Sequence, residues 1–214
     1  MTFTYQSRNI AKSMATLALA CAIPLQSNAA EPGSLDGVYA GLTLNGSKLD
    51  GDITNKTTSS KIGFDSNGME AGIGFEAGLG RSFNDLYLGA SYQYLDNGLG
   101  YADLNSSGSW SGKVEADKIW NASLIPGYYI TRNLLAYGRF GIGQIEISTS
   151  SSSDSEDIDT MTYGLGMKYA LTDMLSASFE YQRSSGDEVF GSNEWDVDSQ
   201  SVLFGIQYRY CMMK

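Results

Sequence analysis

The sequence predicts an all-β fold, a closed up-and-down barrel of eight antiparallel strands. Three observations lead to this prediction. Apolar and polar residues alternate with a period of two in eight separate segments, as they do along β-strands. Tight turns and long polar stretches alternate between these segments. Glycine, with 25 residues, is too frequent within the segments for helices.

The first four segments show the alternation clearly. Residues 38–45 place bulky apolar side chains at even positions and Tyr, Gly, Thr and Asn at odd positions. Residues 69–80 alternate Met, Ala, Ile, Phe and Leu with glutamates and glycines. Residues 86–94 and 120–130 repeat the pattern, and only Pro126 weakens it by removing a ladder donor. Each segment therefore has one bulky apolar face and one face of small or polar residues.

The last four segments follow the same rule and complete a set of eight. Their apolar faces contain no charge, whereas the opposite faces combine Gly, Ser and Thr with single charged residues. An even number of strands returns the end of the chain to the side on which it began. These segments are residues 134–143, 161–169, 175–182 and 202–210.

The predicted connections differ in length on the two sides of the barrel. Tight turns are expected at Asn84-Asp85, Arg132-Asn133 and Thr172-Asp173. Long polar loops are expected at 48–66, 96–117, 148–158 and 184–199. Outer-membrane barrels have short periplasmic turns and long outer loops, so this arrangement predicts that both ends of the chain lie in the periplasm.

Residues 1–30 have the features of a cleaved signal peptide, which leaves a barrel domain at 31–214. Arg8 and Lys12 form a basic start, residues 14–25 form an apolar run, and Ala29 and Ala30 are alternative cleavage sites. The apolar run continues past Cys21, which favours a discarded leader over a lipoprotein anchor.

The nature of the two faces predicts that the barrel lies in a membrane. No apolar stretch long enough for a spanning helix follows the leader. A face of Gly, Ser and Thr suits a narrow interior, whereas the bulky face suits lipid. We therefore expect an eight-stranded transmembrane β-barrel. Two aromatic girdles are expected, with Tyr92, Tyr94, Trp120, Tyr163 and Tyr181 near the loops and Tyr128, Tyr169, Tyr208 and Tyr210 near the turns.

Six charged residues fall on the predicted interior face, and isolated buried charges are costly, so they are expected to pair. They are Glu70, Glu76, Arg139, Lys168, Glu180 and Arg209. Eight strands leave an interior only wide enough for side chains, which favours a plug. The alternative is an ionic gate of a small, low-conductance pore. Replacing Glu76 by Ala should lower the unfolding midpoint in detergent.

Several short stretches together resemble the OmpA-type outer-membrane β-barrel family, which includes the OmpX, Ail and opacity-protein relatives. They are Gly74-Phe75-Glu76-Ala77-Gly78, 126–131, 135–141, 166–172 and 205–210. The resemblance implies assembly by the barrel-assembly machinery, which reads an aromatic residue at the end of the last strand. Here four residues, including Cys211, follow Tyr210. In the family a lysine corresponds to Ile125 and an arginine to Ser178, so the resemblance implies that the interior charges of this chain pair differently from those of its relatives.

Composition narrows the possible functions. The net charge of −10 argues against nucleic-acid binding, and the absence of histidine removes hydrolases that need a histidine base. No pair of acids stands out, so neither an enzyme nor a cofactor or metal site is expected. Cys211 is interpreted as an incidental residue, with intermolecular pairing as the alternative.

The loop acids are interpreted as a solvated surface, with divalent cations bridging to lipopolysaccharide as the alternative. Phe190 and Trp195 are possible loop contacts, or pack a loop against its neighbour. The predicted function is a structural or surface-interaction scaffold, a monomer in a Gram-negative-type outer membrane. Its expected partners are outer-membrane lipid and lipopolysaccharide, and a host or phage surface partner is possible.

Overall fold

The computed structural model describes residues 35–57, 59–66, 69–104, 113–149, 155–190 and 193–210. The predicted signal peptide and Cys211 lie outside these ranges. Within them, no helix is long and apolar enough to cross a membrane. The strands are β1 (Gly37–Asn55), β2 (Ser60–Ser66), β3 (Glu70–Phe83), β4 (Leu86–Leu104), β5 (Lys113–Thr131), β6 (Leu134–Thr149), β7 (Ser155–Ala170), β8 (Leu175–Phe190) and β9 (Asn193–Tyr210).

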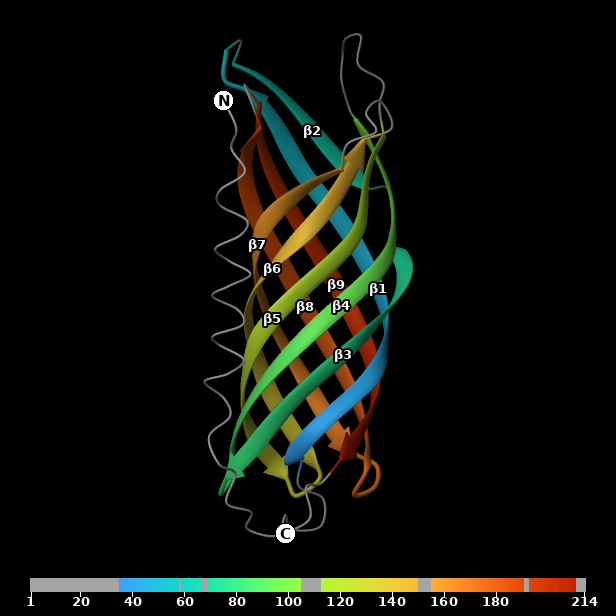
Figure 1. Cartoon of the computed structure of the whole chain (residues 1–214), viewed down its shortest axis with the longest axis vertical. Coiled ribbons are helices and arrows are strands. Elements are labelled where there is room, and N and C mark those ends of the chain that lie inside the picture. Colours follow the sequence, from blue (N-terminus) through green and yellow to red (C-terminus); the bar gives the residue numbers. More distant parts are fainter. Residues whose placement is uncertain are drawn as a thin grey trace.

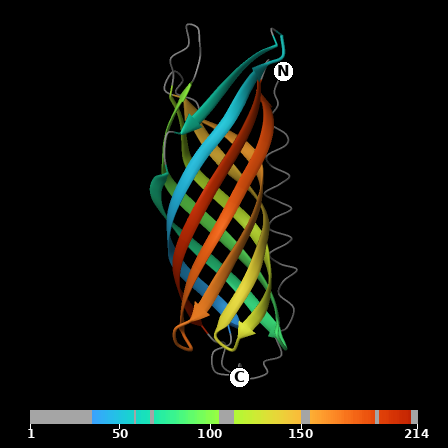
Figure 2. The ribbon, with the colours of Figure 1, turned by 180° about the vertical axis from the view of Figure 1, so that it is seen from behind.

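Eight long strands form a closed antiparallel barrel (Figure 1). From β3 to β9 each strand pairs with the next, and β1 pairs with β3. β1 also pairs with β9 along their whole length, from Val38 opposite Tyr210 to Asn55 opposite Asn193. Figure 2 shows β1 and β9 side by side at this closure. The predicted eight-stranded up-and-down barrel is thus confirmed.

The short connections lie together at one end of the barrel, here called the turn end. Residues 84–85 and 132–133 form two-residue turns, and residues 171–174 form a slightly longer one. Asn84 adopts a φ of 56°, a left-handed conformation that asparagine tolerates better than most residues. β1 begins at this end and β9 finishes there (Figure 1). The opposite end is called the extended end.

The prediction of four long loops at the extended end is wrong, because most of these residues are in strands. β1 continues to Asn55, β4 to Leu104 and β8 to Phe190. The short strand β2 also falls within the predicted loop 48–66, and it pairs with both β1 and β4. The backbone ladder needs no apolar side chains. The point where the outer face stops being apolar therefore marks the end of the apolar belt, the band of apolar side chains around the outside of the barrel. It does not mark the end of the strands.

In the two halves of the barrel, apolar side chains lie on opposite faces of the strands. The turn half is the part next to the turn end, and the extended half is the part next to the extended end. In the turn half, outward side chains such as Leu42, Phe140 and Leu165 are apolar and 60–74% exposed. In the extended half, Lys48 pairs with Asp50 and Lys118 with Glu146 on the outer face, whereas the inward side chains are apolar. β6 shows the reversal within three residues, because Ile142 is exposed and Ile145 is buried.

Candidate functional site

The interior of the turn half is organised around Arg139 on β6. Its Nε donates to Glu180 Oε1 at 2.5 Å, and its Nη2 lies 3.0 Å from both Glu180 Oε2 and Glu76 Oε1. Its Nη1 donates to Ser91 Oγ at 2.8 Å. Arg139 is completely buried, and every nitrogen of its guanidinium group has an acceptor. Such pairing is what makes a buried charge tolerable.

Neighbouring polar side chains donate further hydrogen bonds to the carboxylates of Glu76 and Glu180. The Tyr137 hydroxyl donates to Glu180 Oε2 at 2.8 Å, and the Tyr39 hydroxyl donates to Glu76 Oε1 at 3.1 Å. Gln207 Nε2 donates to Glu76 Oε2 at 3.1 Å. These residues come from β1, β6 and β9, so the cluster joins strands across the barrel.

Two glycines on β7 make room for this cluster. A Cβ at Gly166 would lie 2.6 Å from the Tyr137 ring, and one at Gly164 would lie 3.1 Å from Glu180 Oε1. Gly164 is opposite Arg139 in the β6–β7 ladder, and Gly166 is opposite Glu180 in the β7–β8 ladder. The small residues on the inward face therefore permit the close approach of larger side chains from both neighbouring strands.

The two other buried cations are placed differently. Lys168 Nζ lies 4.1 Å from the centre of the Tyr39 ring and 5.8 Å from that of Tyr137, a cation–π arrangement. Arg209 is 2% exposed, and its three guanidinium nitrogens have no hydrogen-bond partner in the structure. Arg209 therefore lies in the interior without joining the Arg139 cluster.

Glu70 does not belong to the interior cluster. It is exposed at the first residue of β3, six residues before Glu76 and thus roughly 20 Å along the strand. The sequence pattern assigned Glu70 to the interior face by parity alone. The alternation shows only whether a residue lies at an odd or an even position along its strand. It does not show how far along the barrel the residue lies, so it could not exclude Glu70.

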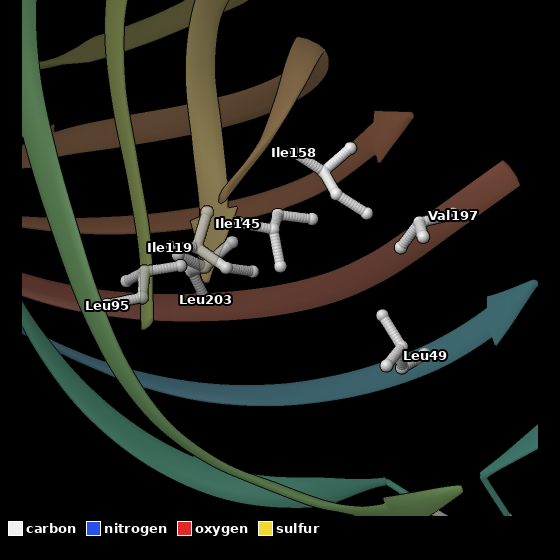
Figure 3. Close-up of a cluster of buried hydrophobic side chains, with 7 residues drawn as sticks. All are labelled: Leu49, Leu95, Ile119, Ile145, Ile158, Val197 and Leu203. Atoms are coloured by element: carbon white, nitrogen blue, oxygen red, sulfur yellow. The ribbon is translucent and has the colours of Figure 1, made fainter. Parts of the chain in front are cut away.

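Apolar side chains close the interior on both sides of the Arg139 cluster. Towards the extended end, Leu95, Ile119, Ile145 and Ile158 are direct neighbours across β4 to β7 and are at most 1% exposed. Figure 3 shows these side chains directed inward together with Leu49, Val197 and Leu203. Towards the turn end, a second cluster contains Leu35, Tyr87, Ile125, Leu135, Tyr137 and Ala170.

The sequence reasoning missed this apolar filling of the extended half. A detectable signal exists in the spacing of the apolar residues, which changes from even to odd at the boundary. On β7, Met161 faces outward and Ile158, three residues earlier, is buried. On β9, Val202 faces outward and Val197, five residues earlier, is buried. An odd spacing on one strand moves a side chain to the opposite face.

The predicted girdle residues lie on the outer wall. Seven of the nine are exposed, whereas Tyr94 and Trp120 are partly buried. Tyr92 stacks on Trp120 with ring centres 6.2 Å apart, and Tyr94 stacks on Phe75 at 5.7 Å. The burial of Tyr94 and Trp120 thus comes from an aromatic cluster across β3, β4 and β5.

The two predicted loop contacts are both strand residues. Phe190 is the last residue of β8 and is opposite Asn193 of β9. Trp195 on β9 is partly buried and packs against the apolar cluster of the extended half. Trp195 therefore has a packing role within the fold. The prediction of a loop position is wrong for both residues, because the β8–β9 ladder continues to the end of the hairpin.

The outer wall of the extended half carries cross-strand ion pairs. Lys61 Nζ lies 3.0 Å from Asp52 Oδ2, and Arg183 forms a fork-like contact with Asp198. Partial burial raises the pKa of the Asp157 carboxyl, and the nearby Glu146 and Asp159 raise it further. Among the described residues, no group of three or more acidic, histidine or cysteine side chains could hold a metal ion.

An outer groove of about 510 Å³ lies where β7 and β8 separate. Their ladder ends at Met161 opposite Ser185, although both strands continue beyond this pair. Trp120 and Met161 line the groove together with Asp187 and Asp196. The groove therefore spans the boundary between the apolar wall and the charged wall.

Comparison with known proteins agrees with this architecture. The family described as "Outer membrane protein beta-barrel domain" matches residues 14–210. No curated protein matches the chain.

Three solved structures are among those similar to this chain, all at low sequence identity. The attachment invasion locus protein Ail of Yersinia pestis, in complex with the heparin analogue sucrose octasulfate, is 15% identical with a TM-score of 0.48, covering 82% of this chain and 100% of Ail. The neisserial surface protein A is 16% identical with a TM-score of 0.49, covering 82% and 98%. The protease OmpT of Escherichia coli is 9% identical with a TM-score of 0.45, covering 86% and 99%.

The matched segment includes every strand of the barrel, from the first residue of β1 to the last residue of β9. The chain therefore belongs to the outer membrane protein β-barrel family, and its location is the bacterial outer membrane.

Proposed function

We propose that this protein is a closed scaffold of the outer membrane that acts through the outer surface of its extended half. The observation that best supports this proposal is the filled interior. Apolar side chains that are at most 2% exposed cross the extended half, and the fully paired Arg139 cluster lies below them. Such an interior leaves little space for a continuous water path, because eight strands enclose only enough room for side chains.

The proposed orientation places the turn end in the periplasm and the extended end outside the cell. Short turns on the periplasmic side are the rule for such barrels. In this orientation the apolar belt contacts lipid, and the charged wall above it meets lipopolysaccharide and the surroundings. The groove between β7 and β8, which Trp120 and Asp187 both line, is the part of that wall best suited to contact a host or phage partner.

A signal peptide at 1–30 directs export, and the barrel-assembly machinery inserts the chain. The barrel functions as a monomer without a cofactor. The chain contains no histidine, so we do not propose an enzymatic activity that requires a histidine base.

Single-channel recording in planar bilayers tests the closed scaffold against a small pore gated by interior charges. The wild-type barrel, with folding verified by heat-modifiable migration on gels, should give no reproducible openings. A variant with Ile119, Ile145 and Ile158 changed to Ser should remain silent while the Arg139 cluster is intact. Adding Arg139→Ala to this variant should produce openings, because both layers are then disrupted.

Reproducible openings of the wild-type barrel would reject the closed scaffold. Their suppression or altered charge selectivity in Lys168→Met would then favour the pore. The matched control is Lys118→Met, which removes the same charge from the outer wall and should leave any conductance unchanged.

A further inference from the structure

Among the residues that the structure describes, Arg209 is a buried cation without an acceptor. Its side chain is 2% exposed, and its Nε, Nη1 and Nη2 atoms have no hydrogen-bond partner in the structure. Arg139, in the same interior, uses all three nitrogens in contacts with Glu76, Glu180 and Ser91. A buried charge that lacks a partner is strongly unfavourable. The contrast indicates that the environment of Arg209 is completed by a group that the described residues do not supply.

A second unused donor lies in the same half of the interior as Arg209. The Tyr87 side chain is 3% exposed, and its hydroxyl also has no hydrogen-bond partner. Arg209 is close enough to Tyr87 and to Lys168 to interact with both electrostatically. The Tyr129 hydroxyl, also nearby, already accepts from the Leu35 amide at 2.7 Å. Arg209 and Tyr87 thus offer four unused donor atoms in the interior of the turn half.

The charges of this interior point to an anion. Among the described side chains that are at least nine-tenths buried, Arg139, Lys168 and Arg209 are positive, whereas Glu76 and Glu180 are negative. Both glutamates already accept from Arg139. The half-buried Asp36 is the other nearby carboxylate, and it accepts a hydrogen bond from Ser82. The fully buried groups therefore carry one excess positive charge.

We propose that Arg209 and Tyr87 form a binding site for a small oxoanion of the phosphate type at the turn end. The planar guanidinium group presents parallel N–H donors that match two oxygens of one oxoanion, and the tyrosine hydroxyl supplies a further donor. Lys168 adds a nearby positive charge. Arg209 is the penultimate residue of β9 and is opposite Tyr39 of β1, so the site lies near the rim of the barrel.

Unfolding by urea in a neutral detergent tests this site, with inorganic phosphate as the probe. The unfolding midpoint of the wild-type barrel should rise with phosphate and saturate as a single binding site does. Chloride at the same ionic strength should produce no comparable rise. In Arg209→Met the apparent dissociation constant should be about tenfold weaker or more, because charged hydrogen bonds are lost.

Lys118→Met is the matched control for Arg209→Met, because it removes a positive charge from the outer wall. It should retain the phosphate-dependent rise. Phosphate also stabilises proteins in general, and such an effect raises the midpoint equally in all variants. An equal rise in the wild type, Arg209→Met and Lys118→Met would overturn the proposal.

Tyr87→Phe gives a second test that alters the fold very little. Without phosphate, the loss of a buried hydroxyl that has no partner should leave the midpoint unchanged or raise it. With phosphate, the variant should gain less than the wild type, because one donor to the anion is absent. An identical gain in both proteins would contradict the role of Tyr87.

Direct binding keeps the proposal testable if Arg209→Met fails to fold. Equilibrium dialysis of the wild-type barrel should give one phosphate per chain, and Arg209→Lys should bind more weakly because its single ammonium lacks the fork. Asp36→Asn should bind phosphate more tightly, since a nearby negative charge is removed. Absence of phosphate binding, together with a large stability loss in Asp36→Asn, would instead make Asp36 the partner of Arg209.

Discussion

The turn half and the extended half of this barrel share most of their strands, but β3 lies between β1 and β4 in the turn half and β2 does so in the extended half. The two halves also have opposite distributions of apolar side chains. The turn half has an apolar outer wall and a polar interior centred on Arg139, whereas the extended half has a charged outer wall and an apolar interior. Only the first pattern suits lipid; the second is that of a water-soluble barrel. Strands that run through both halves can therefore meet two solvents if the side chains exchange faces.

The largest expected effect comes from breaking the charged interior of the turn half. Arg139→Met leaves Glu76 and Glu180 buried without their cation, and removing one partner of a buried ion pair typically costs about 3–5 kcal/mol. Urea unfolding in detergent measures this loss. Lys118→Met breaks an exposed pair of the extended half and should cost at most about 1 kcal/mol. Similar losses in the two variants would contradict the contrast between the halves.

A smaller but still substantial effect is expected from the apolar interior of the extended half. Ile145→Ala should lower the free energy of unfolding by about 2–5 kcal/mol, because it leaves a cavity among residues that are at most 2% exposed. Ile142→Ala on the same strand should cost less, since detergent or lipid chains close around the shortened side chain. Equal losses by urea unfolding would indicate that the extended half has no packed interior.

The glycines that admit the Arg139 cluster should give a moderate effect. Gly166→Ala places a Cβ about 2.6 Å from the Tyr137 ring, and such overpacking costs roughly 1–3 kcal/mol. Gly46→Ala is the control, because its Cβ would meet only the flexible end of Met69 at 3.4 Å. A thermal scan of both variants by heat-modifiable gel migration compares them. A lower midpoint for Gly46→Ala than for Gly166→Ala would argue against a crowded interior.

The smallest effect concerns the charged wall of the extended half. The pKa of the Asp157 carboxyl is raised, so the folded protein binds this proton more tightly than the unfolded chain does. Asp157→Asn should therefore give a slight gain in stability at neutral pH, which disappears as the pH falls through that raised pKa. Urea midpoints at pH 7 and in acid measure the difference. A gain that persists or grows in acid would show that charge repulsion is not its cause.

Sequence reasoning worked best where the solvent itself imposed a pattern. In the turn half the outer face must be apolar and the inner face small or polar, so alternation alone identified all eight strands and brought Glu76, Arg139 and Glu180 to one face. It was less successful in the extended half, where charged residues on a strand resemble a polar loop. The strand β1 and the strands from β4 to β9 were therefore predicted too short.

The amino-acid sequence by itself determined the fold class, the strand number and the face on which each residue of the turn half lies, because these depend only on a period of two. The tertiary structure decided which interior charges meet. Glu70 and Arg209 have the same parity as the Arg139 cluster, yet Glu70 is exposed and Arg209 lies apart. Their positions depend on the stagger of neighbouring strands and on where the ladder ends, which side-chain alternation does not encode.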